Sequence, residues 1–168
     1  MKRMVLSILV DNTAGVLSRV AGLFSRRGYN IDSLTVGETQ NPAISRMTVL
    51  AHGDDQILEQ IQKQLQKLED VIEIKELAHG ESVTRELILV KVCATEKDRQ
   101  AIISIAGIFR AKVVDVALES LMIEMTGNQD KINALIKLLE PYYIKELVRT
   151  GITGLSRGTG DIEDYIDD

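Results

Sequence analysis

Hydrophobic and polar positions in the first half of the chain follow two different repeats, which predict two kinds of secondary structure. A repeat of two predicts strands, and apolar residues three and four positions apart predict helices with one apolar face. In chain order, the predicted elements are strand 4–10, helix 14–27, strands 31–38 and 44–51, helix 55–68 and strand 71–78. The run Thr-Gln-Asn-Pro at 39–42 indicates a turn between the two middle strands. The predicted order is therefore βαββαβ.

The same order of elements is predicted again after Gly80. In this half the elements are strand 86–93, helix 97–109, strands 112–118 and 120–126, helix 129–140, which Pro141 ends, and strand 142–149. We therefore expect an α+β fold of two ferredoxin-like βαββαβ domains, each an antiparallel sheet with both helices on one face. The expected domains are residues 1–79 and 80–160, followed by an acidic tail at 161–168.

The first strand of the second half is apolar on both faces. Leu87 and Leu89 point one way, whereas Ile88, Val90 and Val92 point the other. A sheet with one face in water shows a cleaner alternation. We therefore expect the open face of this sheet to pack against the other half or against another chain.

Charge and composition exclude several functions. The net charge of −5 comes entirely from the acidic tail at 161–168, which carries five acids and no base. Residues 1–160 have 20 bases and 20 acids and are therefore neutral. No basic surface that would attract a phosphate backbone is expected. Strand 45–51 carries no aromatic residue that could stack on RNA bases, so no nucleic-acid partner is expected. Cys93 is the one cysteine, which excludes an intramolecular disulfide and a Cys-x-x-Cys metal site. The tail itself is expected to be solvated and disordered.

Nothing in the sequence has the pattern of a catalytic centre. His52 and His79 have no carboxylate or cysteine at ligand spacing and are predicted to be surface residues. The glycine-rich run 151–158 lacks the end of a P-loop and is predicted to be a flexible connector or a partner-docking segment. The chain also shows no signal-peptide pattern and no membrane span, so a cytoplasmic protein without a membrane partner is expected.

The turn before the first helix is the strongest candidate for a binding site. Asn12 or Thr13 is predicted to cap the helix N-terminus, and Gly28 to end the helix in a left-handed conformation. Gly15 lies where a helix exposes free backbone N–H groups, and its missing side chain lets a small carboxylate approach them. Further groups for such a ligand are the side-chain carbonyl of Asn12 or Asn30, for an ammonium group, and an apolar wall of Val16, Leu17 and Ile31. The alternative is a structural adaptor in which this turn is only a capped helix.

Four stretches of the sequence resemble one known family. Residues 12–31 and the shorter runs 33–36 and 45–48 closely resemble the small regulatory subunit of acetolactate synthase (acetohydroxyacid synthase). Residues 151–158 resemble that family's C-terminal block. The resemblance covers nearly the whole chain except for the acidic tail.

The resemblance implies a function and a set of site residues. The first half would be an ACT domain that forms a homodimer and holds a feedback inhibitor, usually valine, at the interface between the two copies. The residues that match the family's ligand site are Asn12, Ala14, Gly15, Val16 and Leu17 of one chain and Asn30 and Ile31 of the other. The subunit would be non-catalytic and would hold no cofactor. It would activate a large catalytic subunit that carries thiamine diphosphate, FAD and Mg²⁺, and would make that enzyme sensitive to branched-chain amino acids.

Overall fold

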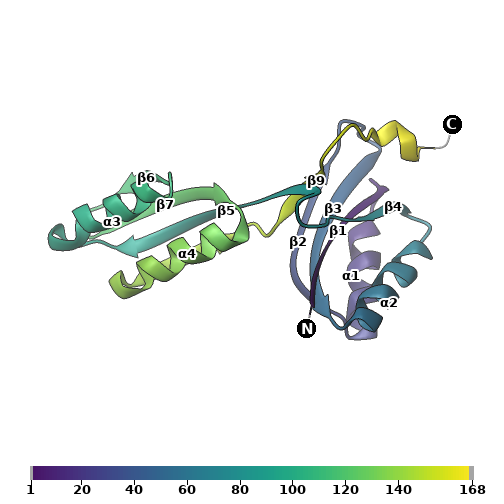
Figure 1. The fold of residues 1–168 in the computed structure, drawn as a ribbon, viewed down its shortest axis with the longest axis horizontal. Coiled ribbons are helices and arrows are strands. Elements are labelled where there is room, and N and C mark those ends of the chain that lie inside the picture. The colour runs from purple at the N-terminus through teal and green to yellow at the C-terminus, as the bar shows by residue number, and fades with distance from the viewer. Residues whose placement is uncertain (1, 167–168) are drawn as a thin grey trace. The chain divides into compact units, whose positions relative to one another are not determined.

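The computed structural model describes residues 2–166, which form two compact units (Figure 1). The first unit comprises residues 2–83 and 152–166, and the second comprises residues 84–151. This division differs from the predicted one, in which the second domain continued to residue 160. The reason is that the chain returns to the first unit after residue 151.

The first unit confirms the predicted βαββαβ order. Its elements are β1 (Lys2–Asp11), α1 (Val16–Arg27), β2 (Asn30–Glu38), β3 (Ile44–Gly53), α2 (Asp55–Gln66) and β4 (Val71–Glu76). The strands form one sheet in the order β2-β3-β1-β4, and every neighbouring pair is antiparallel. Both helices cover the same face of this sheet (Figure 1).

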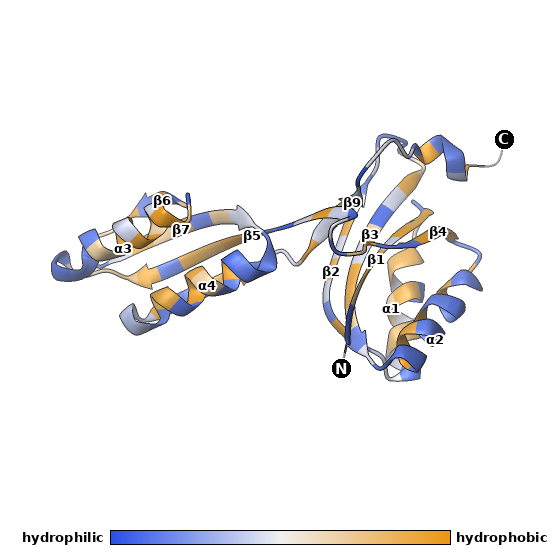
Figure 2. Ribbon diagram, viewed as in Figure 1, coloured by the Kyte–Doolittle hydropathy of each residue, from blue (hydrophilic) through white to orange (hydrophobic). Residues whose placement is uncertain are grey.

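The core of the first unit lies between that sheet face and the two helices. Alternate residues of β1 and β3 point towards the helices, as the two-residue repeat of a strand requires. The fully buried members of this core include Leu6, Ile8, Phe24, Met47, Ile61 and Leu65. Figure 2 shows hydrophobic residues along most of β1 and on the visible side of α1, and α2 with both kinds of residue. Burying each such side chain contributes roughly 1.5–3 kcal/mol, so this layer is the main source of the unit's stability.

The second unit repeats the arrangement. Its elements are β5 (Ser82–Cys93), which begins in the first unit, α3 (Glu96–Ile108), β6 (Lys112–Val116), β7 (Ser120–Gly127), α4 (Gln129–Leu139), a 3-10 turn η1 (Glu140–Tyr142) and β8 (Ile144–Arg149). The strand order is β6-β7-β5-β8. On β5, Ile88, Val90 and Val92 are fully buried in the core, and Leu87 and Leu89 are half-buried on the other face. The cover expected for that other face stays a prediction.

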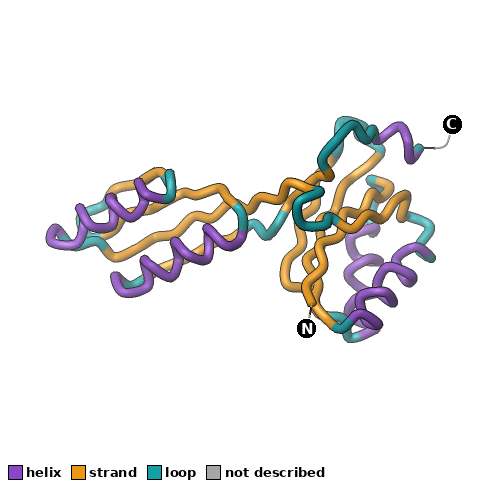
Figure 3. Tube along the Cα trace, in the orientation of Figure 1, coloured by secondary structure: helices purple, strands orange, loops and turns teal. Residues whose placement is uncertain are grey.

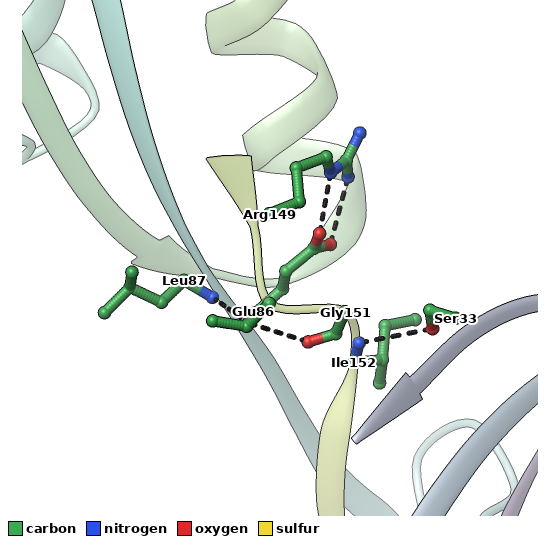
Figure 4. Close-up of polar contacts among 7 residues, drawn as sticks. Ser33, Glu86, Leu87, Arg149, Gly151 and Ile152 are labelled. Atoms are coloured by element: carbon green, nitrogen blue, oxygen red, sulfur yellow. Dashed lines mark hydrogen bonds and ion pairs between the residues drawn. The ribbon is translucent and has the colours of Figure 1, made fainter. Parts of the chain in front are cut away.

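The first unit is completed by residues 152–166, here called the C-terminal strap. It contains β9 (Thr153–Ser156), which pairs with β5, and the 3-10 turn η2 (Ile162–Tyr165), joined by a loop (Figure 3). The Ile152 N–H donates to Ser33 Oγ at 3.4 Å, as Figure 4 shows, and the Thr35 hydroxyl donates to the Ile152 carbonyl at 3.4 Å. Residues 151–158 therefore contain an ordered strand, and the prediction of a flexible connector is wrong.

The acidic end is also more ordered than predicted over residues 161–166. Ile162 is buried against Leu9 and Ile44, on the sheet face opposite the helices. Asp161 and Asp164 form a capping box at the start of η2, so their carboxylates stabilise the turn. The tail prediction failed because Ile162 supplies an apolar anchor among the acids. Residues 167 and 168 lie outside the described residues.

Candidate functional site

The turn between β1 and α1 is tied to the hairpin that joins β2 and β3. The Asn12 backbone N–H donates to the Ala43 carbonyl at 2.8 Å, and Asn12 Nδ2 donates to the Pro42 carbonyl at 2.8 Å. The Asn12 side chain therefore uses its amide donor on the hairpin. Its carbonyl oxygen Oδ1 can still accept a hydrogen bond from a ligand.

Gly15, and not Asn12 or Thr13, is the N-terminal cap residue of α1. Its φ of 86° lies in the left-handed region that favours glycine, and no side chain caps the helix. The prediction of an Asn12 or Thr13 cap is therefore wrong, because the Asn12 side chain is engaged with Pro42 instead. The predicted left-handed C-terminal cap at Gly28 is confirmed, with a φ of 68°.

The uncapped start of α1 presents free backbone N–H groups. The first helical hydrogen bond runs from the Arg19 N–H to the Gly15 carbonyl at 3.0 Å. Within residues 2–166, the N–H groups of Leu17 and Ser18 donate to no acceptor. The first turn of α1 contains no acidic residue, so nothing in it offsets the positive end of the helix dipole. These groups are suited to a carboxylate.

Arg19 adds a positive charge at this place and was missed by the sequence analysis. A Cβ atom on Gly15 would lie 2.9 Å from Arg19 Nη1, so the guanidinium lies directly beside the turn. Arg19 Nε donates to Asp70, and this hydrogen bond raises the pKa of Arg19. The sequence did contain a signal, since Arg19 follows Gly15 by four residues and lies one helical turn further along the same face.

The expected apolar wall is only partly available to a ligand. The Val16 side chain is 4% exposed and packs in the core, so only its backbone can face a ligand. The Leu17 side chain is 47% exposed next to the free N–H groups. Ala14 is exposed in the same turn, whereas Ile31 packs partly against the core.

Asn30 and Ile31 lie at the other end of α1 in the same chain. The helix has twelve residues, so its two ends are roughly 18 Å apart at about 1.5 Å per residue. Asn30 is exposed and begins β2, an edge strand of the sheet, where it pairs in register with His52. One chain by itself therefore brings together residues 12–17 but not the whole predicted set.

His52 has a carboxylate partner that its sequence neighbours did not indicate. Its Nδ1 atom lies 2.9 Å from Asp32 Oδ2, across the β2–β3 pair. Asp32 lies 20 residues away along the chain, so the spacing around His52 did not indicate this partner. Within residues 2–166, no group of three or more histidine, cysteine or acidic side chains is arranged to hold a metal ion. Among the same residues, no helix is long and apolar enough to cross a membrane.

Comparison with known proteins identifies both halves of the chain. A family described as "AHAS small subunit-like ACT domain" matches residues 6–73, and one described as "Small subunit of acetolactate synthase" matches residues 85–158. A probable acetolactate synthase small subunit of Methanothermobacter thermautotrophicus is 52% identical over 156 residues, which are 92% of this chain and 93% of that protein. The small subunit of Haemophilus influenzae is 47% identical over 161 residues, covering 95% of this chain and 99% of the relative.

A solved structure agrees with these relatives. The crystal structure of the acetolactate synthase small subunit of Thermotoga maritima superposes with a TM-score of 0.86 at 40% identity, covering 95% of this chain and 100% of that one. The family resemblance of the sequence is thereby confirmed. With about half of its residues shared over nearly its full length, and with the same fold, the chain belongs to the family of acetolactate synthase small regulatory subunits.

Proposed function

We propose that this chain makes acetolactate synthase sensitive to valine or another branched-chain amino acid, which binds at the start of α1 between two copies of the chain. As a family member, the chain is the non-catalytic partner of a large, thiamine diphosphate-dependent subunit. The observation that carries the proposal is the pair of free N–H groups on Leu17 and Ser18, beside Gly15 and Arg19.

These groups match the two ends of an amino acid. The free N–H groups and the Arg19 guanidinium would bind the carboxylate. The Asn12 side-chain carbonyl would accept from the ammonium group, because its amide nitrogen is already engaged with Pro42. Leu17 would contact the aliphatic side chain.

The involvement of a second copy follows from the position of Asn30. It lies roughly 18 Å from Gly15 in its own chain, so it joins the site only if it comes from another copy. Asn30 is on the edge strand β2, and an edge strand can pair with a second edge. We therefore propose a homodimer in which Asn30 and Ile31 of one copy complete the site formed by residues 12–17 of the other.

Regulation would follow from linkage between the effector site and the large subunit. Valine favours one arrangement of the paired chains, and the large subunit favours another. Either ligand can shift the equilibrium between the two arrangements only by the difference between its affinities for them. Thiamine diphosphate, FAD and Mg²⁺ would be held by the large subunit, and none by this chain.

Substitution of Gly15 tests this site. In Gly15→Asp, a carboxylate of the protein occupies the place of the ligand's carboxylate, so valine binding should weaken by at least about tenfold. Titration calorimetry of the full chain with valine measures this affinity.

The matched control is Gly80→Asp. Gly80 has a similar left-handed φ of 84°, but a Cβ atom there would meet nothing within 4 Å, so this variant carries the same backbone strain without touching the site. Unchanged valine affinity in Gly15→Asp would contradict the proposal. Equilibrium dialysis in which the wild-type chain binds no amino acid would favour the structural adaptor.

A further inference from the structure

A small cavity lies beneath the C-terminal strap, on the sheet face opposite the helices. Its volume is about 220 Å³, below the roughly 300–1,000 Å³ of sites for drug-sized ligands, so it suits a small metabolite. Its floor is formed by Ser7 and Leu9 of β1, and its cover by Leu155, Ser156 and the start of η2. The cavity lies within the first unit and is separate from the turn before α1.

Four charged side chains line this cavity, two basic and two acidic, and one of them is Asp161 of the strap, whose carboxylate accepts from the Glu163 N–H at the start of η2. Arg46 of β3 and Glu73 of β4 lie on either side of Leu9 in the sheet register, and Lys75 of β4 lies beside Ser7. Among the described residues, none of the four forms an ion pair. Both signs of charge are therefore present at one small cavity.

Arg46 is the central group of this arrangement. Its Nη1 donates to Ser7 Oγ, on a serine that is itself buried. Burial lowers the pKa of Arg46, and the nearby Tyr165 only partly opposes this. A guanidinium has five N–H donors, so most of those on Arg46 remain for a ligand, and an anionic partner would offset the cost of burying its charge.

The strap supplies the rest of the wall. Lys75 Nζ donates to Ser156 Oγ at 3.2 Å, which holds the ammonium group at the rim of the cavity. Gly158 and Gly160 also line the cavity, without side chains. Leu9, Leu155 and Ile162 provide apolar contacts.

We propose that this cavity binds a free amino acid, with its carboxylate on Arg46 and Lys75 and its ammonium group on Glu73. A ligand with one group of each sign can pair with the two basic and the two acidic side chains of the wall, whereas a simple anion would face the uncompensated carboxylates of Glu73 and Asp161. This second site lies within one chain and requires neither the dimer nor the effector site at α1.

The test uses the full chain carrying Gly15→Asp, so that binding at the turn before α1 does not contribute. Each proteinogenic amino acid is added in turn at millimolar concentration, and ¹⁵N–¹H spectra follow the backbone amides of residues 156–162. At least one amino acid should shift these amides. The same compound without its amino group, and inorganic phosphate, should bind about tenfold more weakly or not at all.

Three variants in that background show whether the cavity is responsible. Arg46→Met and Lys75→Met should each weaken the response about tenfold or more. Lys75 is exposed, so its variant keeps the test valid if Arg46→Met does not fold. Arg157→Met is the matched control, because this exposed strap arginine does not line the cavity and should leave binding unchanged.

Several results would overturn the second site. They are the absence of any shift in the strap amides, a response that survives both Arg46→Met and Lys75→Met, or equal binding of phosphate. None of them depends on the Gly15 experiment, so failure here and failure of the effector site at α1 are distinguishable.

Discussion

At the scale of single residues, the fold uses its charged side chains in different ways. Lys91 and Glu146 form an exposed pair at 2.6 Å, and the hydrogen bond from Lys91 holds the pKa of the Glu146 carboxyl below its usual value. Glu86 and Arg149 form a different kind of pair, because the Glu86 side chain is 3% exposed. Exposed pairs contribute little to stability, whereas a buried carboxylate depends on its partner.

The Glu86–Arg149 pair gives a prediction for the second unit. Arg149 Nε and Nη2 donate to the two Glu86 carboxylate oxygens at 2.6 and 3.0 Å, across the β5–β8 pair (Figure 4). Arg149→Met leaves the buried carboxylate without this partner and should lower the free energy of unfolding by on the order of 1–3 kcal/mol. Thermal and urea unfolding measure the change. Lys91→Met is the control, and equal losses in both variants would contradict the argument.

Arg19 and Arg46 show what sequence patterns could not predict at this scale. Neither side chain was singled out by the sequence analysis, because one lies on the polar face of a helix and the other among alternating strand residues. Their partners, Asp70 and Ser7, are 51 and 39 residues away along the chain. Only the folded structure brings such groups together.

At the scale of elements, the C-terminal strap behaves as part of the first unit. The Lys75–Ser156 hydrogen bond and the Ile152 contacts with Ser33 and Thr35 attach it to the sheet. Ile162 anchors its end on the sheet face opposite the helices. We therefore expect the strap to contribute to the stability of the first unit.

Substitution of the anchor tests this role. Ile162 is 8% exposed, so Ile162→Ser should destabilise the protein by about 1.5–3 kcal/mol through lost apolar burial. Leu155→Ser, at a strap residue that is 58% exposed, should have little effect on the melting temperature. If both variants had the melting temperature of the wild type, the Ile162 anchor would not contribute to stability.

The βαββαβ elements were predicted because their periodicity is local, whereas β9 and η2 were missed. β9 has four residues, too few for a clear two-residue repeat, and it exists because β5 provides a pairing edge. η2 has one buried apolar residue, Ile162, within an acidic sequence. Short elements of this kind depend on the surface they meet.

At the scale of the whole molecule, each unit has its own apolar core, and the proposed effector site would need a second copy. Residues 12–17 are gathered by one turn, and Asn30 begins the edge strand at the far end of α1. Binding of an effector would therefore be linked to how two copies pair. Any effect on the large subunit must arise from a difference in affinity between such arrangements.

Reciprocity provides a test at this scale. If valine lowers the affinity of the small subunit for the large subunit by some factor, typically about 5–150-fold, the large subunit must lower the affinity for valine by the same factor. Calorimetric titrations with and without each partner measure both factors. Factors that differ would show that the two ligands do not act through a single shared equilibrium, and no change in either would exclude linkage.

The sequence by itself determined the βαββαβ order, its repetition in both halves of the chain, the glycine that ends α1 and the family. These could be predicted because periodicity, turn residues and motifs are properties of neighbouring residues. Tertiary structure alone decided that Gly15 rather than Asn12 starts α1, that Arg19 lies over this turn, and that the strap closes a charged cavity around Arg46. These features arise from contacts between segments far apart in the chain. Their free energy comes from burial and hydrogen bonds that exist only once the sheet has formed.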